Sequence, residues 1–416
     1  MKKILLTGVD FYSPNRGVGA LSYGAISCLL RKEKNIEFGL WNTLGFGGSS
    51  IEKQKIKDFE EKLPFYQTNI FYSFYMLFLS FLVKILPKTM KPLILQASSY
   101  LRELAKYDFV VDLSLGDSFS DFYTWKRAIL NSLTKFIPYN LGQPIYMFPQ
   151  TIGPFRTKFG TAICKKSINL VDKVYAREEI SYKVTSKLLK DKSKLLRAAD
   201  MAFLVKPDEN YNINFLTADE KCKYVGINIS GLLYNDKRRF EILKKEFDYK
   251  LVLKEIINSF LSNGNTKIVL IPHVYSFKND LPNFYDDLRA IKDFKSGLPE
   301  EIKEKVILIE NDLDCKELKK IISSMDFFIG SRMHACIGAL STNVPSALIS
   351  YSYKFKGVLK KLGVMDLECN PKILSEKEII EKINMLYEKR GSIKSKLIPS
   401  NVKMKESAYS CSNILN

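Results

Sequence analysis

Histidine and tryptophan are scarce in this chain of 416 residues, which contains two of each. Its seven cysteines lie far apart without a C-x-x-C pair, a spacing that argues against a disulfide framework and a zinc site and favours a reducing compartment. A Walker lysine motif, a G-x-S-x-G elbow and an H-E-x-x-H pair are also missing, so nucleotide hydrolysis, serine hydrolysis and zinc proteolysis are not expected. Because zinc-finger spacing and RNP-like aromatic motifs are missing too, we expect no nucleic acid partner.

One nearly continuous apolar run covers residues 70–83, with the sequence IFYSFYMLFLSFLV. A helix of this length, rising about 1.5 Å per residue, is too short to span a bilayer of roughly 30 Å. Lysines and prolines follow it as far as residue 92. Two interpretations remain open: a helix buried in the N-terminal domain, or an in-plane helix that holds residues 70–92 against an anionic membrane surface.

Positive charge is in excess, because 64 Lys and Arg residues face 45 Asp and Glu residues and give a formal charge of +19. Such a surface attracts polyanions, phosphorylated small molecules or anionic lipid, although scattered lysines of this kind also arise from genomic base composition alone. The N-terminal MKKILLTGVDFY has a short apolar run and no small-residue cleavage site, so we interpret it as a first strand and not as a signal peptide. We therefore expect a cytoplasmic protein, with the inner face of the cytoplasmic membrane as the alternative.

Short apolar runs alternate with helical stretches, the pattern of parallel sheets covered by helices on both faces. The predicted strands lie at residues 4–7, 109–113, 145–148, 174–176, 225–229, 267–271, 306–309, 327–329 and 346–350. A polar segment at 206–223 is predicted as a linker between domains at 1–205 and 224–375, and a helix and tail at 376–416 either cross back to the first domain or fray. The expected fold class is α/β, with two Rossmann-like doubly wound domains facing a cleft and ligands at the carboxyl ends of their strands.

The most informative segment is 325–353, where an apolar strand ends at Gly330 and is followed by Ser331, Arg332 and His334 at the start of a helix. The N–H groups and dipole of a helix N-terminus attract anions, and an arginine fork suits phosphate or carboxylate. A helix N-terminus favours neutral imidazole, whereas a bound phosphate favours the protonated form. We predict an anion site here, against the alternatives of a structural ion pair for Arg332 and a capping or packed role for His334.

Three more residues are predicted at the same edge of the second sheet. His273 follows an apolar strand and is a second candidate for acid/base chemistry or sugar binding, or else a structural histidine. Lys354 and Lys356 follow the next strand, where they either complete an anion pocket or remain solvated surface charges.

Two carboxylates flank a turn in the first domain. Asp117 and Asp121 follow the strand at 109–113, where they either accept hydrogen bonds from sugar hydroxyls and supply a general base, or bond only to the local backbone. Both possibilities stay open from the residues alone.

Six motifs in order along nearly the whole chain resemble those of the polysaccharide pyruvyl transferase family. They are NRG at 15–17, DLSLGDSFSD at 112–121, FPQTIGPF at 148–155, VYAREEIS at 174–181, AADMAF at 198–203, and GSRMHACIGAL with VPSALISYSYKFKG between 330 and 357. Two positions depart from the family pattern: Met201 stands where proline is common, and one glycine precedes Asp117 where two or three are usual.

The resemblance implies a glycosyltransferase-B-like fold and transfer of the enolpyruvyl unit of phosphoenolpyruvate onto two sugar hydroxyls, as a pyruvate ketal, with loss of phosphate. The acceptor implied is a polysaccharide or lipid-linked glycan precursor of a bacterial capsule or exopolysaccharide, bound on the N-terminal side, with phosphoenolpyruvate on the C-terminal side. No cofactor beyond this co-substrate and no metal are implied. Gln150 and Thr151 resemble cleft-lining positions, and Asn15 falls in an acceptor-side or interdomain loop.

Two other functions remain open. A nucleotide-sugar-dependent glycosyltransferase can have the same two-domain architecture, because fold does not fix the reaction. A non-catalytic scaffold of a polysaccharide assembly complex is the third possibility.

Overall fold

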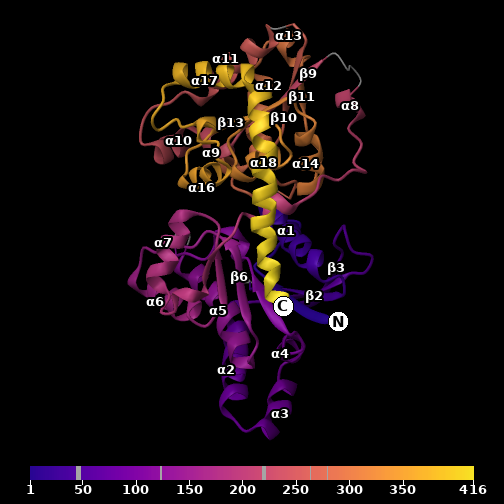
Figure 1. Cartoon of the computed structure of the whole chain (residues 1–416), viewed down its shortest axis with the longest axis vertical. Helices are drawn as coiled ribbons and strands as arrows, with labels where there is room; N and C mark the ends of the chain where they lie inside the picture. The colour runs from indigo at the N-terminus through magenta and orange to yellow at the C-terminus, as the bar shows by residue number, and fades with distance from the viewer. Residues whose placement is uncertain (44–47, 122–123, 218–221, 263, 279) are drawn as a thin grey trace. The chain divides into compact units, whose positions relative to one another are not determined.

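The computed structural model describes residues 1–43, 48–121, 124–217, 222–262, 264–278 and 280–416. The chain forms two compact units, each an α/β fold with its own sheet (Figure 1). Unit 1 comprises Met1–Phe11, Leu21–Met201 and Ser407–Asn416, and unit 2 comprises Tyr12–Ala20 and Ala202–Glu406. The segment that directly follows the first strand of unit 1 therefore belongs to unit 2, which we did not predict.

Unit 1 contains an eight-stranded sheet of order β3-β4-β2-β1-β5-β6-β7-β8, in which every pair is parallel except β3 with β4. Sheet growth reverses direction between β1 and β5, which makes this the switch point of a doubly wound fold. The strands are β1 (Lys2–Thr7), β2 (Ile36–Thr43), β3 (Ser50–Gln54), β4 (Leu63–Thr68), β5 (Phe109–Asp112), β6 (Ile145–Gln150), β7 (Lys173–Ala176) and β8 (Leu195–Arg197).

The helices of unit 1 begin at residues suited to capping. Thr124 and Thr157 accept first-turn N–H bonds at the starts of α5 and α6, and Gly142 ends α5 in the left-handed conformation. The helices are α1 (Arg16–Lys32, whose first residues belong to unit 2), α2 (Ile70–Ile85), α3 (Lys91–Gln96), α4 (Ser99–Leu104), α5 (Trp125–Leu141), α6 (Lys158–Ile168) and α7 (Glu179–Leu188).

Unit 2 contains a six-stranded sheet of order β11-β10-β9-β12-β13-β14, in which every pair is parallel. Its switch point lies between β9 and β12. The strands are β9 (Lys223–Asn228), β10 (Thr266–Leu270), β11 (Val306–Leu308), β12 (Phe327–Gly330), β13 (Ser346–Ile349) and β14 (Glu368–Cys369).

The helices of unit 2 include two with complete capping boxes, at Asp314 with Glu317 and at Ser375 with Glu378. The helices are α8 (Asn214–Thr217), α9 (Gly231–Tyr234), α10 (Asp236–Leu243), α11 (Tyr249–Leu261), α12 (Asp287–Ser296), α13 (Glu300–Lys303), α14 (Cys315–Ser323), α15 (Met333–Ser341), α16 (Tyr353–Leu362), α17 (Glu376–Glu388) and α18 (Arg390–Tyr409). The last of these runs into the closing segment of unit 1.

All nine predicted strands are confirmed to within two residues at either end, and the fold class is confirmed as two Rossmann-like units. The predicted linker, 206–223, contains the short helix α8 and the first residue of β9, while its residues 218–221 lie outside the described residues. The chain passes from unit 1 to unit 2 after Met201. Residues Ser407–Asn416 belong to unit 1, where the Cys28 thiol lies 3.5 Å from the Ala408 carbonyl oxygen.

The apolar run at 70–83 forms most of α2, and neither interpretation from the sequence describes it completely. One side of the helix packs against α5 and buries five side chains, those of Ser73, Met76, Leu79, Ser80 and Val83. The other side exposes aromatic residues to solvent. Among the helices that the structure describes, we find none with the length and hydropathy needed to cross a membrane.

Candidate functional site

The predicted anion site lies at the carboxyl edge of the sheet of unit 2. Asn228 ends β9 and pairs in register with Gly330 at the end of β12, so the two strands that flank the switch point finish side by side. The Asn228 side-chain oxygen accepts the Arg332 backbone N–H at 2.9 Å, which fixes the turn into α15. Arg332 is the N-cap residue of α15, and its side chain does not cap the helix. The first-turn N–H groups therefore face this edge.

The Arg332 guanidinium is held by a carboxylate that we did not predict, Asp287. Its Nε and Nη2 atoms donate to Asp287 Oδ1 at 3.0 and 2.7 Å, and Nη2 also donates to the Tyr285 carbonyl oxygen at 2.8 Å. Burial disfavours the charged form, but the attraction of Asp287 outweighs it and raises the pKa of Arg332. The ion pair that we weighed as an alternative is therefore present, and it fixes the orientation of this arginine.

Asp287 also organises the loop that carries His273. The Asp287 carboxylate accepts backbone N–H groups from Gly231 at 2.9 Å and from Val274 at 3.0 Å, in addition to the guanidinium. It is fully buried at the start of α12. A carboxylate with this many donors holds the ends of β9 and β10 in one rigid arrangement with Arg332.

His273 lies in a cationic environment. Burial lowers the pKa of its imidazole well below 6.5, and His334, Arg332 and Arg16 lower it further. Its Nδ1 atom and the Arg16 Nε atom are both buried without a hydrogen-bond partner among the described residues. Buried polar atoms are usually paired, so these two atoms leave this cluster with hydrogen-bonding capacity for an anionic or polar ligand.

Arg16 joins this cluster because segment 12–20 belongs to unit 2. Its backbone N–H donates to the His273 carbonyl oxygen at 3.1 Å, and its guanidinium lies 4.6 Å from the centre of the Tyr275 ring. It also pairs at 2.5 Å with Asp312, whose side chain is 68% exposed. A pair with so exposed a carboxylate is weakened by solvent, so Asp312 neutralises the Arg16 charge only in part.

The start of α1 also touches His334. A Cβ atom added to Gly17 would lie 2.2 Å from the His334 Nδ1 atom, so only glycine fits at this position. The Asn15 side-chain oxygen accepts the Gly17 N–H at 3.1 Å, and Asn15 forms a bridge with Val274. Asn15, predicted on an acceptor-side or interdomain loop, therefore lies in unit 2, where it pairs with the residue after His273 and holds Gly17 in place beside His334.

The remaining predicted residues of unit 2 take different positions. Ser331 is fully buried, and its hydroxyl lies 2.7 Å from the Tyr249 hydroxyl, which indicates a structural role. Lys354 and Lys356 lie in the first turn of α16, after β13, which neighbours β12 in the sheet. Lys354 is partly buried and Lys356 is exposed.

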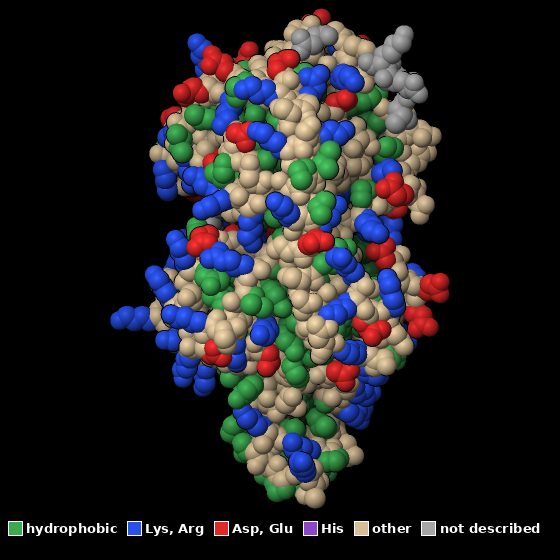
Figure 2. All heavy atoms as spheres, in the orientation of Figure 1, with side chains coloured by type: hydrophobic (Ala, Val, Ile, Leu, Met, Phe, Trp, Pro, Cys, Tyr) green, Lys and Arg blue, Asp and Glu red, His purple; other side chains and the backbone are tan. Residues whose placement is uncertain are grey.

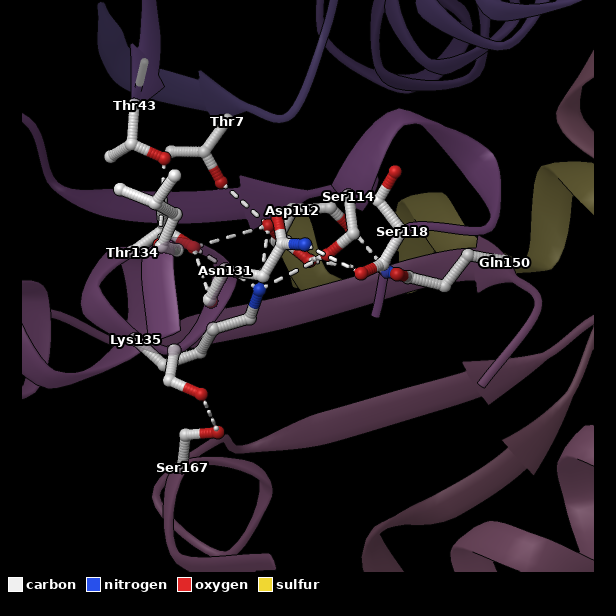
Figure 3. A network of polar contacts seen from close by, with 12 residues as sticks. Thr7, Thr43, Asp112, Ser114, Ser118, Asn131, Thr134, Lys135, Gln150 and Ser167 are labelled. Carbon is white, nitrogen blue, oxygen red and sulfur yellow. Dashed lines mark hydrogen bonds and ion pairs between the residues drawn. The ribbon is translucent and has the colours of Figure 1, made fainter. Parts of the chain in front are cut away.

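The switch point of unit 1 holds a buried polar network (Figure 3). Asp112, at the end of β5, pairs with Lys135 of α5 at 2.8 Å and accepts bonds from Thr7 at 2.9 Å and Ser114 at 2.7 Å. Asp112 and Lys135 are fully buried, and burial lowers the pKa of Lys135 while Asp112 acts in the opposite direction. The network supports a turn in which Ser114 and Leu115 both have positive φ angles.

Two predicted residues join this network, Gln150 through a direct bond to Asp112 and Thr151 through the backbone of the turn. Gln150 donates to Asp112 Oδ2 at 3.2 Å, and the Thr151 N–H donates to the Gly116 carbonyl oxygen at 2.8 Å. Both are buried, so they support the turn that precedes Asp117. Asp117, the residue after this turn, is partly exposed.

Thr151 also belongs to a buried ion pair. Its hydroxyl accepts from Arg177 at 2.7 Å, and Arg177 pairs with Asp200 at 2.9 Å. Asp200 belongs to the AADMAF motif and Arg177 to VYAREEIS, so two of the six motifs meet in this pair.

Asp121 forms local backbone bonds. It accepts the N–H groups of Arg156 and Thr157 at 2.6 and 2.7 Å and the Thr157 hydroxyl at 2.6 Å. Burial opposes ionisation, but these hydrogen bonds prevail and lower the pKa of the carboxyl. The arrangement is typical of the turn-stabilising alternative for Asp121.

A family model described as polysaccharide pyruvyl transferase matches residues 50–353, well over half of the chain. The chain belongs to this family. It is 24% identical over 403 residues to the amylovoran biosynthesis protein AmsJ of Erwinia amylovora, a match that covers 92% of this chain and 91% of that protein. The resemblance inferred from six short motifs is thus confirmed, and the protein is an enzyme, a transferase of polysaccharide biosynthesis.

Solved structures show the same fold at low identity. A putative UDP-N-acetylglucosamine 2-epimerase from Listeria monocytogenes matches with a TM-score of 0.59 and 10% identity, covering 100% of this chain and 95% of that one. A trehalose-phosphate synthase from Burkholderia vietnamiensis matches with a TM-score of 0.55 and 10% identity, covering 100% and 98%. These matches confirm the glycosyltransferase-B-like fold.

Metal ligands do not gather in the parts of the chain that the structure describes. No group of three or more His, Cys, Asp or Glu side chains there is placed to hold a metal ion. All seven cysteines are free and buried.

Proposed function

We propose that this pyruvyl transferase family member moves the enolpyruvyl unit of phosphoenolpyruvate onto two hydroxyls of a sugar in a polysaccharide or lipid-linked glycan precursor. The observation that carries the proposal is the cluster of Arg16, His273, Arg332 and His334 at the switch point of unit 2. Phosphoenolpyruvate brings a phosphate and a carboxylate on three carbons, and this cluster offers cationic groups together with the buried Arg16 Nε and His273 Nδ1 atoms, which lack a partner among the described residues.

The reaction requires one proton to reach the methylene carbon and each of the two sugar hydroxyls to lose one. Protonation of the methylene carbon turns it into a methyl group and leaves an oxocarbenium-like carbon, which one sugar hydroxyl attacks as it loses a proton. The second hydroxyl then displaces phosphate at the same carbon, and its proton leaves with the phosphate. The products are a cyclic ketal and inorganic phosphate, and no oxidant or reductant is consumed.

We assign the first proton transfer to His334, which stands at the N-terminus of α15 where the donor phosphate would bind. His273 is neutral before the donor binds because its pKa is low, so it serves as a hydrogen-bonding group or a second acid/base group. Lys354 lies on the adjacent helix and is our candidate to complete the donor pocket, with Lys356 as a weaker one because it is exposed. Asp117 remains our candidate for the acceptor-side base.

The cytoplasm is the compartment that we propose. All seven cysteines are free thiols, as expected for a protein kept reduced, and phosphoenolpyruvate is a cytoplasmic metabolite. The buried thiols are protonated, since burial raises the pKa of Cys28 and of Cys164 to about 12. They are therefore unreactive and fit no catalytic role.

The function is tested with purified protein, phosphoenolpyruvate and a lipid-linked glycan fraction from cells that natively make this protein. We expect phosphate release that depends on the glycan, and a glycan mass gain of one carboxyethylidene group. His334→Gln should lower the rate about 100- to 10,000-fold, the usual contribution of a positioned acid. Turnover of a UDP- or GDP-sugar without any response to phosphoenolpyruvate would favour the glycosyltransferase alternative instead.

A further inference from the structure

Helix α2 of unit 1 exposes aromatic side chains on the side opposite its buried residues, which are two serines and three apolar residues. We define the aromatic face of α2 as the side chains of Phe71, Phe74, Tyr75, Phe78, Phe81 and Ile85. All six are exposed, Phe71 by 73% and Phe78 by 59%. Their spacing of mostly three or four residues places them on one side of the helix. A second stripe, with Met76, Leu79 and Val83, packs into the core, so α2 is apolar on both sides although only one side is covered.

The buried serine hydroxyls of α2 form hydrogen bonds that hold the helix in this orientation. The Ser73 hydroxyl bonds to the Asn69 carbonyl oxygen at 2.7 Å and to the Thr68 hydroxyl at 3.0 Å. Asn140 of α5 donates to the Ser80 hydroxyl at 3.1 Å. Rotating α2 to bury its aromatic face would break these bonds, so the exposure follows from the local packing.

The apolar surface continues beyond α2. Met90 and Leu93 are 42% and 66% exposed in the segment that follows. Figure 1 shows that α2, α3 and α4 project together beyond the strands of unit 1, and Figure 2 shows hydrophobic side chains gathered on this projection with Lys and Arg among them. An exposed apolar patch of this kind marks a binding surface.

The charge of the projection is mainly positive, and its one acidic residue, Glu103 near the end of α4, pairs with Lys106 at 2.6 Å. Residues 69–102 contain no Asp or Glu, whereas Lys84, Lys88, Lys91 and Arg102 are basic. Lys84 lies 3.8 Å from the centre of the Tyr139 ring, so it is held at the end of α2. Apolar and aromatic side chains bordered by basic residues fit the boundary between the acyl chains and anionic headgroups of a bilayer.

We propose that the aromatic face of α2 binds the surface of an anionic lipid bilayer, with the helix lying in the plane of the interface. The charge argues against a second copy of the chain as the occupant, because two such faces would bring their basic residues together. Lipid headgroups supply the opposite charge. The proposal rests on unit 1 alone and holds whichever donor unit 2 binds.

The test is flotation of the purified full-length protein with vesicles of phosphatidylcholine alone and of phosphatidylcholine mixed with phosphatidylglycerol. The main variant is Phe78→Ser with Phe81→Ser. Phe159→Ser with Phe240→Ser is the matched control, since these residues are 55% and 51% exposed elsewhere. Circular dichroism and thermal melting of each variant show whether it is folded.

We expect the wild type and the control to float with the anionic vesicles and the main variant to lose at least about tenfold in partitioning. Replacing Lys88 and Lys91 by glutamine should weaken partitioning by about fivefold for each lysine, and high salt should do the same to the wild type. The proposal is overturned if the wild type does not float, or if the folded main variant floats equally well. Sedimentation that shows a dimer lost only in the main variant, without vesicle binding, would assign the face to self-association.

Discussion

Replacing Lys135 by methionine should destabilise unit 1 more than any change of an exposed lysine. Methionine keeps most of the aliphatic stem but removes the ammonium, which lies 2.8 Å from the Asp112 carboxylate. The carboxylate would then be a buried charge without a countercharge, because both side chains are at most 1% exposed. Breaking one partner out of a buried pair costs about 3–5 kcal/mol, and we expect Lys135→Met to fall in this range.

The remaining contacts of Asp112 argue for the lower half of the range. Thr7, Ser114 and Gln150 still donate to the carboxylate and stabilise its charge in part. Asp112→Asn in the Lys135→Met background removes the uncompensated charge and keeps one acceptor oxygen for these donors. The double variant should therefore be more stable than Lys135→Met alone, by about 1–3 kcal/mol.

Tryptophan fluorescence during urea unfolding measures the loss of stability of unit 1 specifically. The chain has two tryptophans, Trp41 and Trp125, and both belong to unit 1. Trp41 is fully buried in β2, so its emission shifts when the unit unfolds. Lys166→Met on the exposed side of α6 is the control and should change stability by less than about 0.5 kcal/mol. A cost below about 1 kcal/mol for Lys135→Met would refute the ion-pair account.

Three further predictions concern the sites. His273→Gln should make the protein less sensitive to acid. The pKa of His273 is low in the folded protein, so this histidine is protonated first in the unfolded chain, and the wild type should lose about 1.4 kcal/mol of stability per pH unit below about pH 6.5. The variant should not show this loss, and urea unfolding between about pH 7.5 and 5.5 measures the difference. Gly17→Ala should displace His334 and lower turnover at least about tenfold. Gly391→Ala is the control, because open space surrounds the added Cβ atom, and it should stabilise α18 by about 0.5–1 kcal/mol. Asp121→Ala should cost about 1–3 kcal/mol of stability in a thermal melt, with turnover lost only in proportion.

Each of these three predictions would be contradicted by one specific result. Equal acid lability of wild type and His273→Gln would mean that His273 is not held neutral. Full activity of Gly17→Ala would show that the start of α1 does not position His334. A raised KM for the glycan in a fully stable Asp121→Ala protein would place Asp121 at the acceptor.

Short apolar runs at regular intervals made most of the fold predictable. Strands such as β10, which ends in Ile268-Val269-Leu270, and β12, which begins with Phe327-Phe328-Ile329, are buried on both faces, so their sequences contain unbroken apolar runs. β2 and β4 were missed because they lack this signal. β2 contains Glu37 and Gly39, and β4 begins with Leu63-Pro64.

The site was predictable where motifs lie at strand ends and unpredictable where distant segments meet. His273 and His334 follow strands of the same sheet, so topology places them at one edge. Asp287 was missed because its partner Arg332 lies 45 positions away, although a buried arginine in this position is itself a reason to search for a carboxylate. The contribution of Arg16 depends on its backbone bond to His273, which no local pattern encodes.

The central claim is that the cluster around His273 and His334 binds phosphoenolpyruvate, and titration calorimetry of this compound into the purified protein tests it most directly. We predict saturable binding to the wild type and at least about tenfold weaker binding to folded His334→Gln, a loss of about 1.4 kcal/mol. Absence of binding to the wild type, or equal binding to both proteins, would contradict the account.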